Sequence, residues 1–166
     1  PNAVREYLYQ LTKAKWNLAL ADLGNIYAGE RLEDTYAALH ECCASLMQQN
    51  IIPIIIGGGQ DLTYSTYRAF DKLEQTVNIT SIDSRINLGD QTAPLTSENY
   101  LSHIILQKPY RLFNYSQIGH QTYFINQDEL DLMDRMYFDS QRLGAFRNNI
   151  QEAEPYLRDA DLVSFD

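Results

Sequence analysis

Basic residues and long apolar runs are both scarce in this sequence, and each shortage excludes a class of partner. The 166 residues include 13 lysines and arginines against 22 aspartates and glutamates, so the net charge is −9. A nucleic-acid backbone or an anionic membrane needs a positive protein face, and we expect neither as a partner. No apolar run reaches the roughly 18 residues that a membrane span requires. We therefore expect a cytoplasmic protein.

Cysteine and histidine are also rare. Cys42 and Cys43 are adjacent in a predicted helix, where their side chains point about 100° apart, so a disulfide between them would be strained. Their spacing matches no zinc pattern, and two free thiols are typical of a cytosolic protein. Of the three histidines, only His120 directly follows a predicted strand, which makes it a candidate for the edge of a functional site.

The remaining composition is that of a globular protein, with 45% hydrophobic and 21% charged residues. Apolar periodicity predicts alternating strands and helices, which indicates an α/β fold with a mainly parallel sheet and one domain over residues 1–166. The β-branched run at residues 51–56 predicts a strand that is buried on both faces. The predicted helices are 1–11, 32–49, 62–73, 98–106, 128–136 and 145–158; the predicted strands are 18–23, 51–56, 77–82, 111–118, a short one near 138, and 161–165.

Polar residues follow three of the predicted strands. Gln60 comes after residues 51–56, Asp83 directly after residues 77–82, and Asp166 after residues 161–165. Ligands of open parallel sheets bind beyond the carboxyl ends of the strands. One such aspartate is usually a helix cap or a turn former, but the recurrence at three strand ends favours a shared site.

Several segments, in this order, resemble the arginase, agmatinase and formimidoylglutamase family, the ureohydrolases, and its formimidoylglutamase-like branch most closely. They are "PNAVREYLYQL", "DLGNIYAGE", "IPIIIGGGQDLTYSTY", "NITSIDSRINLGD", "YSQIGHQTYF" and "EAEPYLRDADLVSFD". The resemblance implies a three-layer α/β/α fold of the arginase/deacetylase type. It also implies that the chain is truncated at both ends, without the family's first strand and its C-terminal strands.

The same resemblance implies a chemistry and a set of metal positions. Active members use two manganese ions to hydrolyse C–N bonds of small linear amidines and guanidines, and family members often form homo-oligomers. Gln60 stands where active members have a histidine. The family pattern Asp-Ala-His-x-Asp reads "DSRIN" here, with Asp83, Arg85 and Asn87 at the ligand positions. Asp166 matches the first aspartate of a later Asp-x-Asp pattern.

These substitutions argue against manganese. Amide oxygens of Gln60 and Asn87 are weaker ligands than the carboxylate and imidazole that this ion prefers, and Arg85 has no lone pair to give. A guanidinium about 4 Å from a dication would be repelled by about 8 kcal/mol at an effective dielectric near 20. We therefore expect no manganese here and hypothesise that Arg85 bridges Asp83 and Asp166, with the two amides completing the hydrogen bonds.

Three functions stay open, and the sequence does not decide whether the chain is an enzyme. The first is a family member that has lost its metal site, the second an active formimidoylglutamase-like hydrolase with an altered site. The third is nucleotide binding, because a glycine run follows a predicted strand and opens a helix. The turn comprises Gly57, Gly58 and Gly59, with Asp61 at the possible edge of the site. Leu62, however, stands where the dinucleotide fingerprint has its helix-packing glycine.

Overall fold

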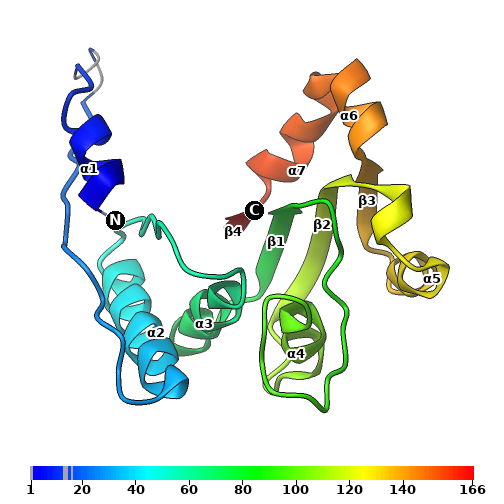
Figure 1. The fold of residues 1–166 in the computed structure, drawn as a ribbon, viewed down its shortest axis with the longest axis horizontal. Helices are drawn as coiled ribbons and strands as arrows, with labels where there is room; N and C mark the ends of the chain where they lie inside the picture. Colours follow the sequence, from blue (N-terminus) through cyan, green and yellow to red (C-terminus); the bar gives the residue numbers. More distant parts are fainter. Residues whose placement is uncertain (1, 13–14, 16) are drawn as a thin grey trace.

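The centre of the protein is a sheet of four parallel strands in the order β3-β2-β1-β4 (Figure 1). The computed structural model describes residues 2–12, 15 and 17–166. None of its described helices has the length and hydropathy to cross a bilayer. The elements along the chain are α1 (Asn2–Leu8), α2 (Leu32–Gln48), α3 (Leu62–Ala69), η1 (Phe70–Leu73), β1 (Val77–Ile82), α4 (Tyr100–Leu106), β2 (Leu112–His120), η2 (Thr122–Phe124), α5 (Gln127–Arg135), β3 (Asp139–Arg142), α6 (Leu143–Asn148), η3 (Ile150–Ala153), α7 (Glu154–Arg158) and β4 (Leu162–Phe165).

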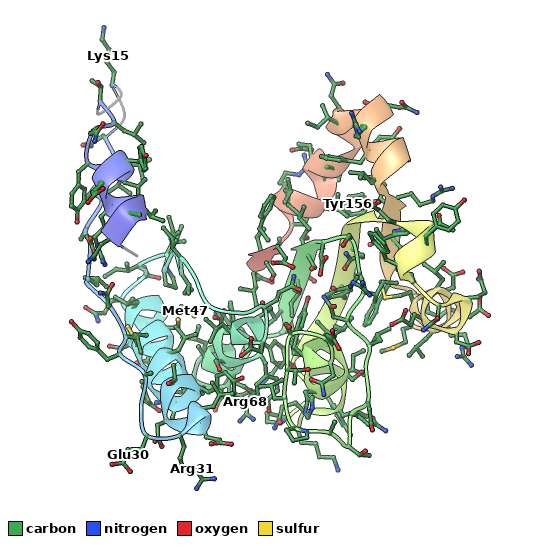
Figure 2. All side chains as sticks on the ribbon, in the orientation of Figure 1. Lys15, Glu30, Arg31, Met47, Arg68 and Tyr156 are labelled. Carbon is green, nitrogen blue, oxygen red and sulfur yellow. The ribbon has the colours of Figure 1, made fainter. Side chains whose placement is uncertain are left out.

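Alternation along the strands assigns the two faces of the sheet. Val77 and Ile79 of β1 and Tyr115 of β2 point to one face, where they join a buried cluster with α3 and α4. On the opposite face, the hydroxyl of Thr80 donates to the main-chain carbonyl of Tyr156 in α7, and Figure 2 labels Tyr156 close to the strands. Helices therefore cover both faces, as the predicted three-layer α/β/α fold requires.

Most predicted elements are confirmed within a few residues, with one helix divided. The predicted helix over residues 145–158 is three short pieces, α6, η3 and α7. Asn149 interrupts it with φ −144° and ψ 86°. A new helix, α7, then begins at Glu154 with Pro155 in its first turn, where proline fits better than in a helix interior. Pro1, which we expected to start the first helix, lies outside the described residues.

Two predicted strands are wrong. Residues 18–23 and 51–56 are assigned to no strand, and most of their apolar side chains are exposed. A strand needs a neighbour that pairs with its main-chain groups, and sequence periodicity shows only which side chains alternate. No such neighbour lies beside either segment among the described residues.

Candidate functional site

Three polar side chains form a row across the carboxyl ends of the buried strands. Ser81 of β1 is in register with Ser164 of β4 on one side and Gln117 of β2 on the other. All three are buried. Asp83 is two residues after Ser81 in the sequence. The loop that follows β1 therefore begins beside this row and carries the predicted site residues.

The centre of the site is one side-chain amide between two oxygens. Asn87 Nδ2 donates to Asp83 Oδ2 over 2.6 Å and to Gln60 Oε1 over 2.8 Å. An ionised carboxylate only accepts hydrogen bonds, so Asn87 must present its NH2 group to Asp83. Asn87 adopts φ +61°, a left-handed conformation that asparagine tolerates better than most residues. The structure thus brings together three of the five predicted metal positions.

The carboxylate of Asp83 is well supplied with donors. It is only 7% exposed, and its Oδ1 accepts from the main-chain N–H of Arg85 over 3.0 Å and from the hydroxyl of Ser84 over 3.3 Å. Together with Asn87, three neutral donors hold this carboxylate. A buried charge needs such hydrogen bonds when no counter-ion is paired with it.

The amide of Gln60 connects the centre to the row of strand-end residues. Its Nε2 donates to the hydroxyls of Ser81 and Ser164, each over 3.3 Å. On the α3 side, Thr63 Oγ1 lies 2.8 Å from Ser164 Oγ. Because Gln60 gives its NH2 group to the serines, its oxygen is free to accept from Asn87.

A second path through buried tyrosines closes the network. The hydroxyls of Ser81 and Tyr100 are 3.2 Å apart, and those of Tyr100 and Tyr115 are 3.4 Å apart. Tyr115 donates to Gln117 Oε1 over 2.7 Å, and Gln117 Nε2 donates to the carbonyl of Asp83 over 2.8 Å. Burial raises the pKa of both tyrosines, so they remain neutral hydroxyl donors. This second path therefore ends at Asp83, the residue whose carboxylate lies at the centre of the site.

The predicted arginine bridge is wrong. Within the described residues, no guanidinium nitrogen of Arg85 lies within 4 Å of either carboxylate. Its guanidinium carbon is instead 5.2 Å from the ring centre of Phe124, in a cation–π contact. Arg85 is exposed, and so is Asp166, whose main-chain N–H donates to the carbonyl of Ile82. An exposed guanidinium keeps its hydration, and the neutral amide of Asn87 already satisfies the buried carboxylate.

The glycine turn is a backbone feature that delivers Gln60 to the site. Gly57 and Gly58 have φ +100° and +81°, and a Cβ on Gly58 would lie 2.3 Å from a side-chain atom of Leu62. These positions therefore require glycine. Asp61 accepts a hydrogen bond from the hydroxyl of Tyr36 in α2, and burial followed by this partner raises the pKa of the tyrosine. Asp61 thus joins α2 to the start of α3, and among the described residues its side chain makes no hydrogen bond to Gln60, Asp83 or Asn87.

His120 lies at the same edge of the sheet but outside the network. It is 4% exposed, and its Nδ1 has no hydrogen-bond partner among the described residues. Burial, followed by the positive charge of Arg142, lowers the pKa of this imidazole, so it is neutral at pH 7. Arg142 is also its register partner on β3.

The donor set is poor in metal ligands. No group of three or more histidine, cysteine, aspartate or glutamate residues that could hold a metal occurs in the part of the chain that the structure describes. We did not predict the roles of Ser81, Tyr100, Tyr115, Gln117 and Ser164. The signal that could have found the strand residues is a polar side chain near the carboxyl end of each of three predicted strands, Ser81, Gln117 and Ser164.

Comparisons with known proteins agree with the resemblance drawn from the sequence. Formimidoylglutamase of Streptococcus gordonii is 29% identical over 134 residues, covering 73% of this chain and 39% of the relative. Formimidoylglutamase of Lysinibacillus sphaericus is 26% identical over 144 residues, covering 82% and 43%. The chain therefore spans less than half the length of these curated relatives.

Solved structures share the fold. A Trypanosoma cruzi formiminoglutamase with Mn²⁺ has a TM-score of 0.83 at 18% identity, covering 96% of this chain and 58% of that one. A quadruple mutant of a Trypanosoma brucei arginase-like protein, with three serines changed to aspartate and one arginine to histidine, has a TM-score of 0.63 at 14% identity, covering 84% and 44%. The sequence model of the Arginase family matches residues 1–166, and the chain belongs to this family.

Proposed function

We propose that this chain is a catalytically degenerate member of the arginase and formimidoylglutamase family that no longer binds two manganese ions. The observation that carries the proposal is the position of Asn87 Nδ2, which donates to both Asp83 Oδ2 and Gln60 Oε1. A metal ion between these oxygens would need their lone pairs. Here one neutral NH2 group takes both.

The residues present do not fit a dinuclear manganese centre. Asp83 is the only carboxylate of the central set, and its oxygens already accept three hydrogen bonds. Gln60 and Asn87 can offer only neutral amide oxygens, which compete poorly with water for a hard dication. Turning Asn87 to present its oxygen would leave two acceptors facing each other beside Asp83. We therefore derive no reaction step through a metal.

One solved relative supports this interpretation. In the T. brucei arginase-like protein, the arginine changed to histidine lies two residues after one serine-to-aspartate change and two residues before another. Asp83, Arg85 and Asn87 have the same spacing. An arginine at the middle position of such a triplet is therefore not confined to this chain.

Loss of the metal removes the family's usual nucleophile. Metal-bound water is acidic enough to act at neutral pH because of the ion's charge. Asp83 is a poor substitute as a general base, since its lone pairs are engaged by three donors. The network is therefore suited to holding the strand ends together, and the remaining function is that of a binding or scaffold protein with the family's fold.

The competing candidate is an active formimidoylglutamase-like hydrolase, which is favoured by the names of both curated relatives. Its substrate would be a small amidine, N-formimidoyl-L-glutamate. Its metal site would have to form from Gln60, Asp83 and Asn87 after the amide of Asn87 reorients.

Elemental analysis distinguishes the degenerate family member from the active hydrolase. The chelator-treated protein is equilibrated with excess manganese, freed of unbound ions, and assayed for bound metal and for formamide release from N-formimidoyl-L-glutamate. We expect no stoichiometric metal and no turnover. The matched comparison is the triple variant Gln60→His, Arg85→His and Asn87→Asp, which should retain manganese better than the unsubstituted chain. Two bound equivalents in the unsubstituted chain would reject the proposal.

A further inference from the structure

A cavity of about 510 Å³ lies on the face of the sheet that α7 covers. The first halves of β1 and β2 form its floor, and its walls include Asp139 at the start of β3 and Tyr156 of α7, which Figure 2 labels. Asn78 in the floor and Asp83 are five residues apart along the chain, which is about 16 Å at about 3.3 Å per strand residue. This cavity, hereafter the Asp139 cavity, is therefore separate from the centre at Asn87.

The floor of the Asp139 cavity is polar, although the faces of a parallel sheet are normally apolar. Asn78 of β1 is in register with Asn114 of β2, and the next row joins Thr80, Ser116 and Asp139 of three neighbouring strands. All five residues line the cavity, and Thr80 and Ser116 are buried. Polar side chains under a helix require hydrogen bonds, from the protein or from a ligand.

The donor groups on the β2 side of the floor already have acceptors. Asn114 Nδ2 donates to Asp139 Oδ2 over 3.0 Å, and the hydroxyl of Ser116 donates to the same oxygen over 3.3 Å. These two bonds fix the carboxylate of Asp139 at the edge of the floor, with its Oδ2 turned toward β2.

The donor groups on the β1 side are engaged by α7 and the residue that follows it. The hydroxyl of Thr80 donates to the main-chain carbonyl of Tyr156 over 2.7 Å, and Asn78 Nδ2 donates to the carbonyl of Asp159 over 3.1 Å. Each donor group of the floor thus has a protein partner, and a ligand would find acceptors there.

The acceptors that remain are oxygens, and two of them belong to carboxylates. Within the described residues, Asp139 Oδ1 accepts no hydrogen bond from a side chain, and Asn78 Oδ1 is buried without a partner. The exposed carboxylate of Asp159 also lines the cavity, and its Oδ1 lies 3.6 Å from Arg158. None of the described residues that line the cavity is a lysine or an arginine. A ligand must therefore bring hydrogen-bond donors, and a positive charge is favoured.

The rim of the Asp139 cavity is aromatic and apolar. Phe113, Met136 and Tyr137 line it, and the aromatic side chains Phe113 and Tyr137 are 74% and 89% exposed. Aromatic faces attract cations and also bury apolar groups. The rim therefore suits the hydrocarbon part of a ligand whose charged end lies on the floor.

We propose that the Asp139 cavity binds a small organic cation, in which a primary ammonium group is joined to an aromatic or alkyl body. The ammonium has three donors. One bonds to Asp139 Oδ1, and a second reaches Asn78 Oδ1 after a small rotation of that side chain. The body of the ligand lies between Phe113 and Tyr137. This binding involves neither metal nor the centre at Asn87.

Other classes of ligand fit the Asp139 cavity less well. An anion would be repelled by the carboxylates of Asp139 and Asp159. A bare metal ion prefers several charged or imidazole ligands, and no group of three or more such side chains occurs in the described part of the chain. A neutral alcohol of the same shape could use the rim but would form no charge-assisted hydrogen bond with Asp139.

Two matched compounds test the proposal. The chain is titrated at pH 7 with 2-phenylethylammonium and, separately, with 2-phenylethanol, and amide signals are followed by ¹H–¹⁵N NMR. We expect the ammonium compound to shift the signals of residues 78–80, 113–116 and 136–139. Its Kd should be at least about 10-fold lower than that of the alcohol, because only the ammonium forms a charge-assisted hydrogen bond.

Three variants locate the binding. Asp139→Asn keeps an oxygen that accepts from Asn114 and Ser116 but removes the charge, so the Kd for the ammonium compound should rise about 10-fold and that for the alcohol should hardly change. Glu98→Gln is the matched control, because it removes the same charge from an exposed side chain outside the cavity, and it should change neither Kd. Phe113→Ala, at an exposed rim position that the fold does not need, should weaken binding of both compounds.

Four outcomes would overturn the proposal. The first is equal affinity for the two compounds, since the cavity would then be only an apolar cleft. The second is an unchanged Kd for the ammonium compound in both Asp139→Asn and Phe113→Ala. The third is a set of shifts confined to residues outside the cavity, such as Ile150 and Leu157. The fourth is no saturable shift with the ammonium compound up to about 20 mM, which corresponds to a Kd too weak for a ligand site.

Discussion

Replacing the central amide by a carboxylate, Asn87→Asp, tests whether a neutral donor is what the site requires. The substitution keeps the shape of the side chain and removes the N–H groups that face Asp83 Oδ2 and Gln60 Oε1. Two carboxylates would then meet in a site where Asp83 is 7% exposed. At about 4 Å and an effective dielectric near 20, their repulsion is about 4 kcal/mol.

Alternatively, one of the two carboxyls of the variant could stay protonated, which costs a similar free energy. Keeping a carboxyl with an ordinary pKa near 3.9 protonated at pH 7 costs about 4 kcal/mol, at about 1.4 kcal/mol per pKa unit. We therefore expect Asn87→Asp to lower the free energy of unfolding at pH 7 by about 3–4 kcal/mol. The pKa of the introduced carboxyl is raised in the folded state, so its penalty is absent below about pH 4 and grows as the pH rises.

Urea unfolding at pH 4 and pH 7 measures this difference. The matched control is Asn126→Asp at the exposed N-cap of α5, where a carboxylate is as good a cap as the amide and the stability should stay within about 0.5 kcal/mol. Manganese should stabilise Asn87→Asp and not the unsubstituted chain, because only the variant gains a second carboxylate ligand. A loss below about 1 kcal/mol at pH 7, or equal stabilisation of both proteins by manganese, would refute the reasoning.

Three further predictions follow from other contacts. Tyr115→Phe removes the hydroxyl donor to Gln117 and should cost about 1–2 kcal/mol in urea unfolding; no loss would mean that this path does not stabilise the fold. His120 has a lowered pKa in the folded state, so stability should fall as the pH drops below about 6.5, with a smaller fall in His120→Gln; an NMR titration midpoint above that value would contradict this. Gly58→Ala should destabilise by about 1 kcal/mol or more, because φ is +81° and a Cβ would meet Leu62, whereas Gly144→Ala, with open space around it and a helical backbone, should be neutral or stabilising in thermal unfolding.

The elements that apolar periodicity predicted also carry local determinants of their own. α2 has acidic residues Glu33 and Asp34 in its first turn, where they complement the helix dipole. α5 begins at Asn126 with Glu129 three residues later, which is a capping-box pattern. Strand β1 has Val77 and Ile79 at alternate positions, and both pack into the core. These elements need little information from distant parts of the chain.

The predictions that were wrong concern elements that depend on a distant partner. The run at residues 51–56 has the composition of a buried strand, yet composition does not supply the neighbour that pairs with it. The same limit applies to the site. Strand-end position indicated a shared site for Gln60, Asp83 and Asp166, and the family resemblance added Asn87. In the structure Asn87 bonds to Gln60 and Asp83, whereas the side chain of Asp166 is exposed. Neither signal could decide whether Arg85 would reach the carboxylates or point into solvent.

The outcome at Arg85 follows from comparing the two groups that competed for one carboxylate. A guanidinium in the site would gain a charge-assisted bond to Asp83 but would lose its hydration on burial, and a buried ion pair often recovers no more than that cost. The amide of Asn87 is four residues from Asp83, carries no charge to desolvate, and satisfies Gln60 at the same time. A neutral donor with two acceptors is therefore the less costly arrangement, and Arg85 keeps its hydration beside Phe124.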